Sequence, residues 1–539
     1  PNMDKLQSLY IFLWQSVNRP IQSVEDLKNF YDNSSIRQSV IADLYGMVMQ
    51  DEVENDVWKK LTDSKTIDHD GRLLNYQNDY TQLVRTFRLS QTKTESRLIF
   101  LLNNINTRHR RINIPKELYQ FVERHLDRFI DNAKYALFMS VGVDYVIDVD
   151  RTGLDPDLNP KIIIIDKNTG TDQSSSQWHE ALHQFLQIKH GCKLSLMSLK
   201  AVFTSNVSYL KLYQKLYGLS GTLGSTQEKE LLNQLYNVDL VKIPTSKPKK
   251  FFEERSIISG YNEQWMENIY RIAKAKLLNG RSVLIIGETV KDVDYIIKRL
   301  IKIATESETS ESKEQECGTL KNPYVYKREH EEFVFGQGNE YLSGGKVIVA
   351  TNLAGRGTDI KLDKKLVKAG GLHVILTFLP VNCRVEEQAY GRAARCGEKG
   401  SGQLIVIGNE EDGGSFSSKI FQLKNARDVN ELQRLKMVQK FYDERITIEE
   451  NCFKIFKDKY EELRRKIELY EDTKDLTKLV LDSFLDKWAF WLDENSTLIE
   501  NHTSDSSKKS QLSKLLQQFL EPISVNFVDW LDSPSQFLK

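Results

Sequence analysis

The sequence predicts an α/β fold combined with all-helical regions, and three observations lead to that prediction. From about residue 240 to residue 408, short apolar runs alternate with helical segments. Two shorter strand-like runs joined by a turn come before this part, and helical periodicity dominates both ends of the chain. Buried runs separated by helices are typical of a parallel sheet covered on both faces. We therefore expect a parallel-sheet domain between a mixed α+β region and a helical tail.

Four apolar runs are the expected strands of the parallel sheet: SVLIIG (282–287), KVIVATN (346–352), HVILTF (373–378) and QLIVIG (403–408). A helical stretch to about residue 303 follows the first run, as the alternation of strand and helix requires. The polar, acidic segment 305–318 is expected to form a loop.

Helical spacing dominates the first part of the chain. One helix is predicted by the apolar residues Leu6, Leu9, Tyr10 and Leu13. Another is expected after Pro115, and its apolar face would hold Leu118, Phe121, Val122, Leu126, Phe129, Ile130, Ala133 and Leu137. The runs DYVIDV (144–149) and KIIIID (161–166) follow as a predicted β-hairpin, because a turn rich in Gly, Asp and Pro joins them.

After about residue 413 the chain is expected to be helical. A narrow apolar stripe at spacings of three and four predicts one long helix with Phe453, Phe456, Tyr460, Leu463, Ile467 and Tyr470 on one side. The stripe is too short for a coiled coil and suits a scaffold helix that lies against other parts of the protein. The segment 495–510 is polar and rich in serine, so we expect a linker there.

Length and composition narrow the class of protein. A chain of 539 residues is long enough for three or four domains. The 75 basic and 75 acidic residues balance, so no bulk field favours nucleic acid or anionic lipid. Five cysteines without a CxxC pair suit a reducing compartment and give no cysteine-rich zinc site. No apolar run approaches the roughly 20 residues that span a bilayer, and no signal peptide opens the chain.

The segment KVIVATNLAGRGTDI (346–360) carries the first candidate site. A buried strand runs directly into a turn in which Gly355 and Gly357 flank Arg356, followed by Thr358 and Asp359. Glycines at the carboxyl end of a strand let the backbone approach a ligand closely. A fixed arginine beside them can place a guanidinium group on a phosphate.

The segment EEQAYGRAARCGEKG (386–400) carries the second candidate site. If it is helical, Gln388, Arg392 and Arg395 fall on one face at positions i, i+4 and i+7. Two aligned guanidinium groups would neutralise charge on a transferring phosphoryl group. The competing interpretation is a pair of solvated surface arginines, which is the commoner meaning of such a pair. The glycine turn after a buried strand favours the functional interpretation.

These segments resemble the last two motifs of RecA-like motor ATPases of helicase superfamily two, and within it the SecA family of preprotein translocase motors. ATNLAGRGTDIKL (350–362) is nearly letter for letter the SecA version, and GGLHVI (370–375) before QxxGRxxR keeps the family's order. GLSGTL (218–223) is similar to the family's GMTGTA turn, and IPTSKP (243–248) to its IPTNRP linker. VDYVID, IIIIDKNTG and WHEALHQ are similar to its preprotein-crosslinking domain. The resemblance covers roughly residues 125–410.

The resemblance implies a domain order. It consists of a helical N-terminal segment (1–114), a preprotein-crosslinking-like region (115–195), the tail of a first motor domain (196–245), a second RecA-like motor domain (246–412) and a helical scaffold (413–539).

The resemblance also implies ATP and Mg²⁺ as cofactors, bound between two motor domains. Arg356 and Asp359 would contact nucleotide, Arg392 and Arg395 would act on its γ-phosphate, and the remaining cofactor-binding residues would be Gly355, Gly357, Thr358 and Gln388. The implied partners are an unfolded preprotein and a membrane translocation channel, with a cytoplasmic location and peripheral membrane contact.

HEALH (179–183) matches the HExxH pattern of zinc proteases, which presents two histidines on one helix face. A zinc protease needs a third ligand downstream, and no Asp or Glu occurs between Gln184 and Gln227. His190 would lie about 10 Å beyond His183 on a continued helix. Because the segment also resembles the crosslinking domain, we expect no metal at this motif.

The largest departure from the family is the absence of GxxxxGK[ST], the loop that cradles nucleotide phosphates. A chain that starts at Pro1 without an initiator Met suggests a fragment whose first motor domain lies largely upstream, or else a degenerate relative. This chain alone is not expected to hydrolyse ATP. A nucleic-acid helicase and a non-catalytic interaction protein remain as alternatives; the zero net charge and the lack of basic patches weigh against the helicase.

Overall fold

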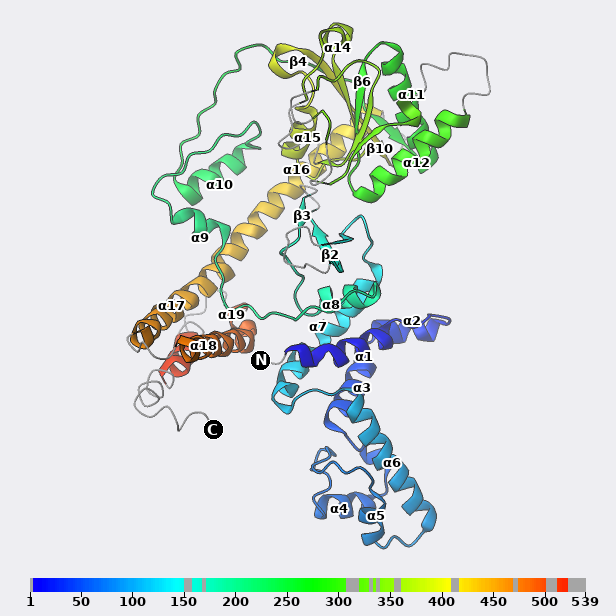
Figure 1. Ribbon diagram of the computed structural model, residues 1–539, viewed down its shortest axis with the longest axis vertical. Coiled ribbons are helices and arrows are strands. Elements are labelled where there is room, and N and C mark those ends of the chain that lie inside the picture. Colours follow the sequence, from blue (N-terminus) through cyan, green and yellow to red (C-terminus); the bar gives the residue numbers. More distant parts are fainter. Residues whose placement is uncertain are drawn as a thin grey trace. The chain divides into compact units, whose positions relative to one another are not determined.

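The computed structural model describes residues 3–149, 158–166, 171–306, 319–328, 333–335, 340–352, 360–408, 416–468, 474–500 and 511–521. The chain forms two compact units (Figure 1). Unit 1 comprises Pro1–Ile165 and Gln173–Ser198, and unit 2 comprises Asp166–Asp172 and Leu199–Lys539. The predicted combination of an α/β sheet with helical regions is confirmed.

Unit 1 is mainly helical, as expected. Its helices are α1 (Gln7–Val17), α2 (Val24–Tyr31), α3 (Ser34–Tyr45), α4 (Asn55–Asp63), α5 (Thr81–Thr86), α6 (Thr92–Arg111), α7 (Tyr119–Phe138) and α8 (Leu182–Lys189), with 3-10 turns at Met3–Leu6, Gln50–Glu52 and Lys116–Leu118. The apolar face predicted for the helix after Pro115 is buried along α7 except at Leu137, which is half-buried, and its first member, Leu118, is buried in the 3-10 turn before the helix. Tyr10 of α1 lies edge-on to Phe129 and to Phe185, with ring centroids 5.8 Å apart in each pair. This contact joins α1, α7 and α8 into one core.

The predicted hairpin of unit 1 is confirmed. Strands β1 (Tyr145–Val149) and β2 (Pro160–Ile165) pair antiparallel, with Tyr145 opposite Ile164 and Val149 opposite Pro160. A short strand β3 (Asp172–Gln173) completes a three-stranded sheet in the order β1-β2-β3. The turn expected between the two long strands lies at 150–157, outside the described residues.

Unit 2 contains a seven-stranded sheet in which every described pairing is parallel. The four predicted strands are present as β6 (Ser282–Ile286), β8 (Val347–Ala350), β9 (Leu372–Leu376) and β10 (Lys399–Ile407). Three further strands were not expected: β4 (Lys250–Glu253), β5 (Ile257–Ser259) and β7 (Tyr324–Tyr326). The sheet order is β4-β10-β9-β6-β8-β7, and β5 also pairs with β10.

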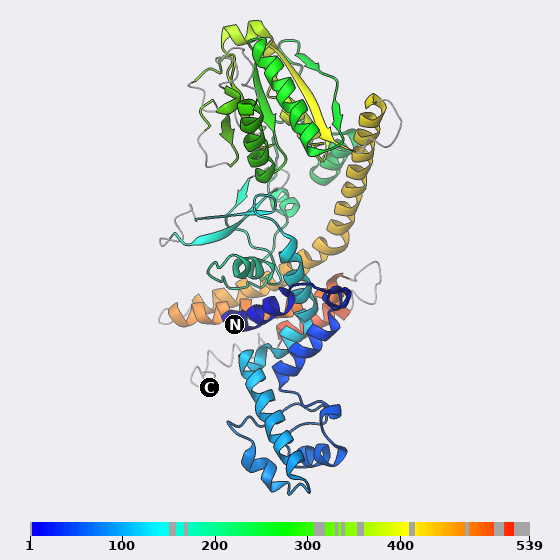
Figure 2. The same ribbon diagram turned by 90° about the vertical axis from the view of Figure 1, so that its right-hand side faces the viewer.

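Both faces of this sheet are covered, as predicted for parallel strands. Val283 and Ile285 of β6 pack in the cluster formed with α11 (Asn262–Leu278) and α12 (Val290–Glu306). Leu284 and Ile286 alternate onto the opposite face, in a cluster that includes residues of α14 (Lys364–Ala369) and α15 (Cys383–Tyr390). Figure 2 shows α11 and α12 lying along the strands.

The rest of unit 2 is helical. Two short helices, α9 (Asn206–Lys211) and α10 (Thr226–Tyr236), precede the sheet. After it come α16 (Phe416–Phe441), a π-helical turn at Tyr442–Ile446, α17 (Thr447–Glu468), α18 (Lys474–Glu494), α19 (Ser496–Glu500) and a helix at 511–521. The predicted stripe on α17 packs as expected through Leu463, and Phe456 stacks on Trp488 of α18 at 4.3 Å. None of the described helices combines the length and the apolar character needed to cross a bilayer.

Candidate functional site

The first candidate segment leaves the parallel sheet at its carboxyl edge, whereas the second leads into strand β10 at the opposite, amino edge. Strand β6 pairs with β8 on one side and with β9 on the other, and all three run parallel. The chain therefore leaves β8 after Ala350 and β9 after Leu376 at the carboxyl edge, which is where ligands bind in open α/β sheets. The order of the strands also reverses around β6, because β9 returns to the side opposite β8.

The glycine-rich turn after β8 carries five predicted site residues that lie outside the described residues: Gly355, Arg356, Gly357, Thr358 and Asp359. Both ends of the turn are anchored. Thr351 donates from its backbone to the carbonyl of Tyr326 at 3.1 Å and from its hydroxyl to the carbonyl of Lys327 at 2.9 Å. On the other side of the turn, Ile360 is buried in the core under the sheet.

Helix α15 begins after the N-cap residue Asn382 and ends before Arg392 and Arg395, which were predicted to lie on it. The Asn382 side chain accepts a hydrogen bond from the backbone N–H of Val385 at 3.1 Å, which caps the first turn. The helix stops at Tyr390, and Ala394 and Cys396 both adopt left-handed conformations with φ of 57° and 52°. The prediction that Gln388, Arg392 and Arg395 share one helix face is therefore wrong.

Packing against strand β10 explains why the helix ends there. A Cβ atom placed on Gly400 would lie 2.4 Å from the backbone nitrogen of Ala394, and one on Gly402 would lie 2.5 Å from the ring of Tyr390. The chain after Tyr390 therefore lies directly on the backbone of β10. This close approach of two segments overrides a local sequence that favours a helix, because a continued helix would carry residues 391–396 away from the strand.

The three predicted residues consequently lie in different environments. Arg392 is buried, with 5% of its surface exposed. Arg395 is half-buried, and its Nε donates to the carbonyl of Gly391 at 2.8 Å. Gln388 is exposed on α15, and its Nε2 donates to the hydroxyl of Thr222 at 3.1 Å.

The contact of Gln388 with Thr222 brings together two segments that are 166 residues apart in the sequence. Thr222 belongs to GLSGTL (218–223), which follows α9 and precedes α10. Sequence reasoning identified this segment by resemblance but did not place Thr222 at the site. One available signal was the capping box STQE, in which Ser225 and Glu228 fix the start of α10 directly after the loop.

A second link runs from the first turn of α15 to α10 and α16. The Arg384 Nε lies 2.7 Å from Glu228 Oε1, and an Arg384 amino group lies 3.8 Å from Glu431. Glu228 is 7% exposed, so its charge is largely removed from water and depends on this arginine. The two carboxylate partners of Arg384 could not be predicted from residue spacing, because they lie 156 and 47 residues away in the sequence.

Glu386 forms a third link, and this carboxylate is buried. Its two oxygens accept hydrogen bonds from Lys424 Nζ at 2.6 Å and from Arg427 at 2.5 Å, both on α16. Burial is the largest single influence on the pKa of Lys424 and lowers it, but the hydrogen bonds and negative charges of Glu386 and Glu253 together outweigh burial and raise that pKa above its ordinary value. The ammonium also lies 3.1 Å from Glu253 of β4. Helix α15 is thus tied to α16 through Glu386 and to the loop of Thr222 through Gln388.

The HExxH match does not form the helix that a zinc protease requires. Glu180 and Ala181 have φ of 52° and 63°, and α8 begins only at Leu182. Glu180 instead forms an ion pair of 2.5 Å with Arg128. His183 is buried, and burial lowers its pKa to about 4. His179 and His183 are therefore not successive residues on one helix face.

The donor set at the end of α15 and in the segment after it suits a phosphate better than a metal ion. Arg392, Arg395 and Gln388 provide N–H donors, and guanidinium groups bind phosphate oxygens well. Within the described ranges no group of three His, Cys, Asp or Glu side chains could hold a metal ion. The arrangement can thus neutralise the charge of a nucleotide phosphate.

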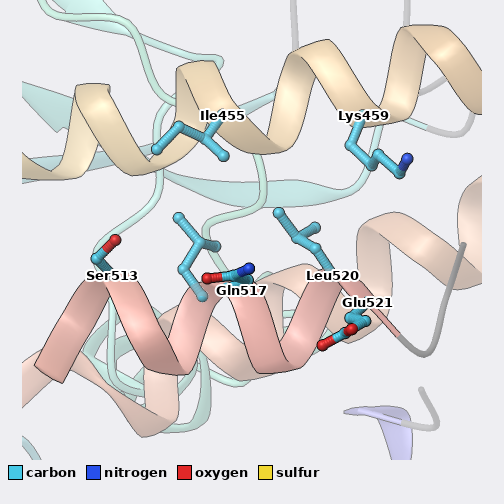
Figure 3. A pocket seen from close by; sticks show the side chains of 7 residues that line it. Ile455, Lys459, Ser513, Gln517, Leu520 and Glu521 are labelled. Carbon is cyan, nitrogen blue, oxygen red and sulfur yellow. The ribbon is translucent and has the colours of Figure 1, made fainter.

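A separate pocket lies in the helical part of unit 2, between α17 and the helix at 511–521 (Figure 3). It is an open hollow of about 400 Å³, lined by Ile455, Lys459, Ser513, Leu516, Gln517, Leu520 and Glu521. Lys459 is already paired with Glu462 at 2.7 Å. None of the predicted site residues lines this pocket.

None of the known protein-family models matches the chain.

Proposed function

We propose that this chain is part of a SecA-like, ATP-driven motor that moves unfolded protein across or into a membrane, and that its parallel sheet is a RecA-like motor domain. The observation that carries the proposal is the hydrogen bond between Gln388 and Thr222. It joins two segments that resemble motor motifs, GLSGTL (218–223) and the QxxGRxxR segment that begins at Gln388, beside the parallel sheet. Membership of the family itself rests on the sequence resemblance.

In this proposal ATP binds between two motor domains, as the resemblance implies. Arg395 and Arg392 act on the γ-phosphate, because guanidinium groups stabilise the charge that develops during phosphoryl transfer. Arg356 and Asp359 contact the nucleotide from the turn after β8. Mg²⁺ would supply charge neutralisation between the phosphates, held by ligands other than the described side chains.

Unit 1 and the helices after the sheet take the roles that the resemblance implies. Unit 1 contains the crosslinking-like segment and would contact the unfolded preprotein, while the helical region would act as the scaffold beside a membrane channel. The motor would be cytoplasmic and peripheral to the membrane. Relative movement of the motor parts, driven by hydrolysis, would then move the polypeptide.

Calorimetric titration with Mg²⁺ and either ATP or ADP tests the nucleotide part of the proposal. The titrations use the chain as printed and a form extended by the coding sequence that precedes it. We expect tight binding only for the extended form, since the chain lacks a P-loop. Arg395→Ala in the extended form should retain binding and abolish hydrolysis, while Arg271→Ala, an exposed arginine on α11, should change neither.

Three results would contradict the proposal. Absence of nucleotide binding by both forms would identify a non-catalytic relative. Turnover stimulated by RNA or DNA, and not by unfolded polypeptide, would identify a helicase. An unchanged rate of hydrolysis in Arg395→Ala would remove the role assigned to that arginine.

A further inference from the structure

An open hollow lies in the helical part of unit 2, between α17 and the helix at 511–521 (Figure 3). Its apolar lining consists of Ile455 from α17 and of Leu516 and Leu520 from the other helix. The volume is about 400 Å³, and pockets of roughly 300–1,000 Å³ accept whole small ligands. The hollow therefore has room for one or two large side chains.

The apolar cluster beneath the hollow is not closed on this side. Leu516 is buried in that cluster, whereas Leu520 packs against it and is only partly buried. Ile455 is the neighbour of the buried Phe456 in α17 and is itself 51% exposed. An apolar side chain in this position forgoes the favourable free energy of burial as long as it faces water. A cover over the hollow would therefore extend the core.

A strongly apolar segment begins directly at the border of the hollow. Glu521 lines the hollow and is the last residue of the described helix. After it the sequence continues with PISVNFVDWLDSPSQFLK (522–539), which lies outside the described residues. Pro522 lacks a backbone N–H, so it disfavours continuation of the helix and favours a change in the direction of the chain.

This segment is apolar enough to fill the hollow and long enough to reach it. Six of the nine residues in ISVNFVDWL (523–531) are apolar, and two of them are the large aromatic residues Phe527 and Trp530. The helix from Ser513 to Glu521 rises by about 12 Å. An extended chain covers roughly 20 Å by the sixth residue after Glu521 and about 30 Å by the ninth. Both aromatic side chains are therefore within reach of the hollow.

We propose that residues 522–531 fold back over the hollow as a strap, with Phe527 and Trp530 packed against its apolar lining. Covalent attachment favours this segment over a separate partner. A short flexible linker gives a tethered group an effective concentration in the millimolar range, so even a weak contact is occupied. Burial of the two aromatic side chains stabilises the contact, because each can remove about 150–250 Å² from water. This inference does not depend on the motor function proposed above.

Hydrogen exchange measured by mass spectrometry on the full chain tests the strap. The double variant Phe527→Ser/Trp530→Ser should speed exchange about tenfold in 453–460 and in 513–521, since these segments lose their cover. Phe537→Ser is the matched control, because Phe537 is an aromatic residue of the same segment beyond the proposed strap. Its exchange should equal that of the unmodified chain. An unchanged rate in the double variant, or an equal increase in Phe537→Ser, would overturn the inference.

A labelled peptide with the sequence of residues 522–539 gives a second readout, by fluorescence anisotropy. It should bind the double variant, whose hollow is open, at least about tenfold more tightly than the unmodified chain, in which the tethered strap competes. Adding Ile455→Ser to the double variant should weaken that binding about tenfold. Leu479→Ser is the control for this substitution, since Leu479 of α18 is 62% exposed and does not line the hollow.

Two results of the peptide experiment would contradict the strap. They are the absence of peptide binding to the double variant and an equal loss of binding in Ile455→Ser and Leu479→Ser. A third result comes from hydrogen exchange at different protein concentrations. Protection of 453–460 that rises with concentration and is lost in the double variant would show that a second copy supplies the segment, which overturns the tethered strap.

Discussion

Replacing Glu386 by glutamine should loosen helix α15 from α16 while leaving the fold of the sheet intact. The substitution removes the charge that pairs with Arg427 at 2.5 Å and with Lys424 at 2.6 Å. Removing one partner of a buried ion pair costs about 3–5 kcal/mol, because the other charge is left in a poorly solvated place. In the variant Arg427 would still pair with Asp428 at 2.9 Å, and Lys424 would still pair with Glu253 at 3.1 Å. We therefore expect a loss of stability at the lower end of this range, about 3 kcal/mol.

Hydrogen exchange measured by mass spectrometry reports the stability of each segment separately. A local measurement is needed because a protein with several parts does not unfold in a single two-state transition. A loss of about 3 kcal/mol corresponds to exchange roughly a hundredfold faster in α15 and in the first half of α16, with β6 and β9 unaffected. Glu387→Gln is the matched control, since Glu387 is the exposed neighbour on the same helix. Unchanged exchange in Glu386→Gln, or an equal change in Glu387→Gln, would refute the reasoning.

Three further predictions concern other parts of the molecule. Burial holds the pKa of His183 near 4, below its ordinary 6.5. The folded protein therefore has its full stability from the neutral His183 side chain above pH 6.5. About 3 kcal/mol is lost as the pH falls from 6.5 to 4, and a urea-unfolding series across pH should show a shallower dependence in His183→Gln. Gly400→Ala places a Cβ 2.4 Å from a backbone nitrogen and should lower the melting temperature measured by calorimetry by several degrees. Lys189→Met removes an ammonium that donates to the carbonyls of Ala136, Leu137 and Met139, and should speed amide exchange at the end of α7, whereas Lys193→Met should not.

The sequence by itself was enough to predict the strands that are buried on both faces and the helices that bury one regular apolar face. The runs at β6, β8, β9 and β10 consist almost wholly of apolar residues because both of their faces are buried, and such runs are identifiable without a structure. The same holds for α7 and for the stripe of α17 through Leu463, where a single apolar face repeats at helical spacing. The hairpin of β1 and β2 was predictable because its turn composition separates two short strands.

Strands with exposed or mixed environments could not be predicted in this way. Strand β4 has no fully buried residue, and β7 has one. Their apolar runs, FF in β4 and YVY in β7, are only two and three residues long, and their positions follow from hydrogen bonds to β10 and β8, which are distant in the sequence.

The candidate site, too, was predictable from the sequence only in part. Its residue types and their order were identifiable from the sequence, including Gln388, Arg392 and Arg395. Their geometry was not, because the end of α15 is set by the contact with Gly400 and Gly402 of β10. The partners Thr222, Glu228 and Arg427 come from segments far apart in the chain, and only tertiary packing brings them to α15. Local patterns encode which elements form, but a helix end or an ion pair that depends on a distant backbone is decided by the folded structure, since its energy arises only when both segments are in place.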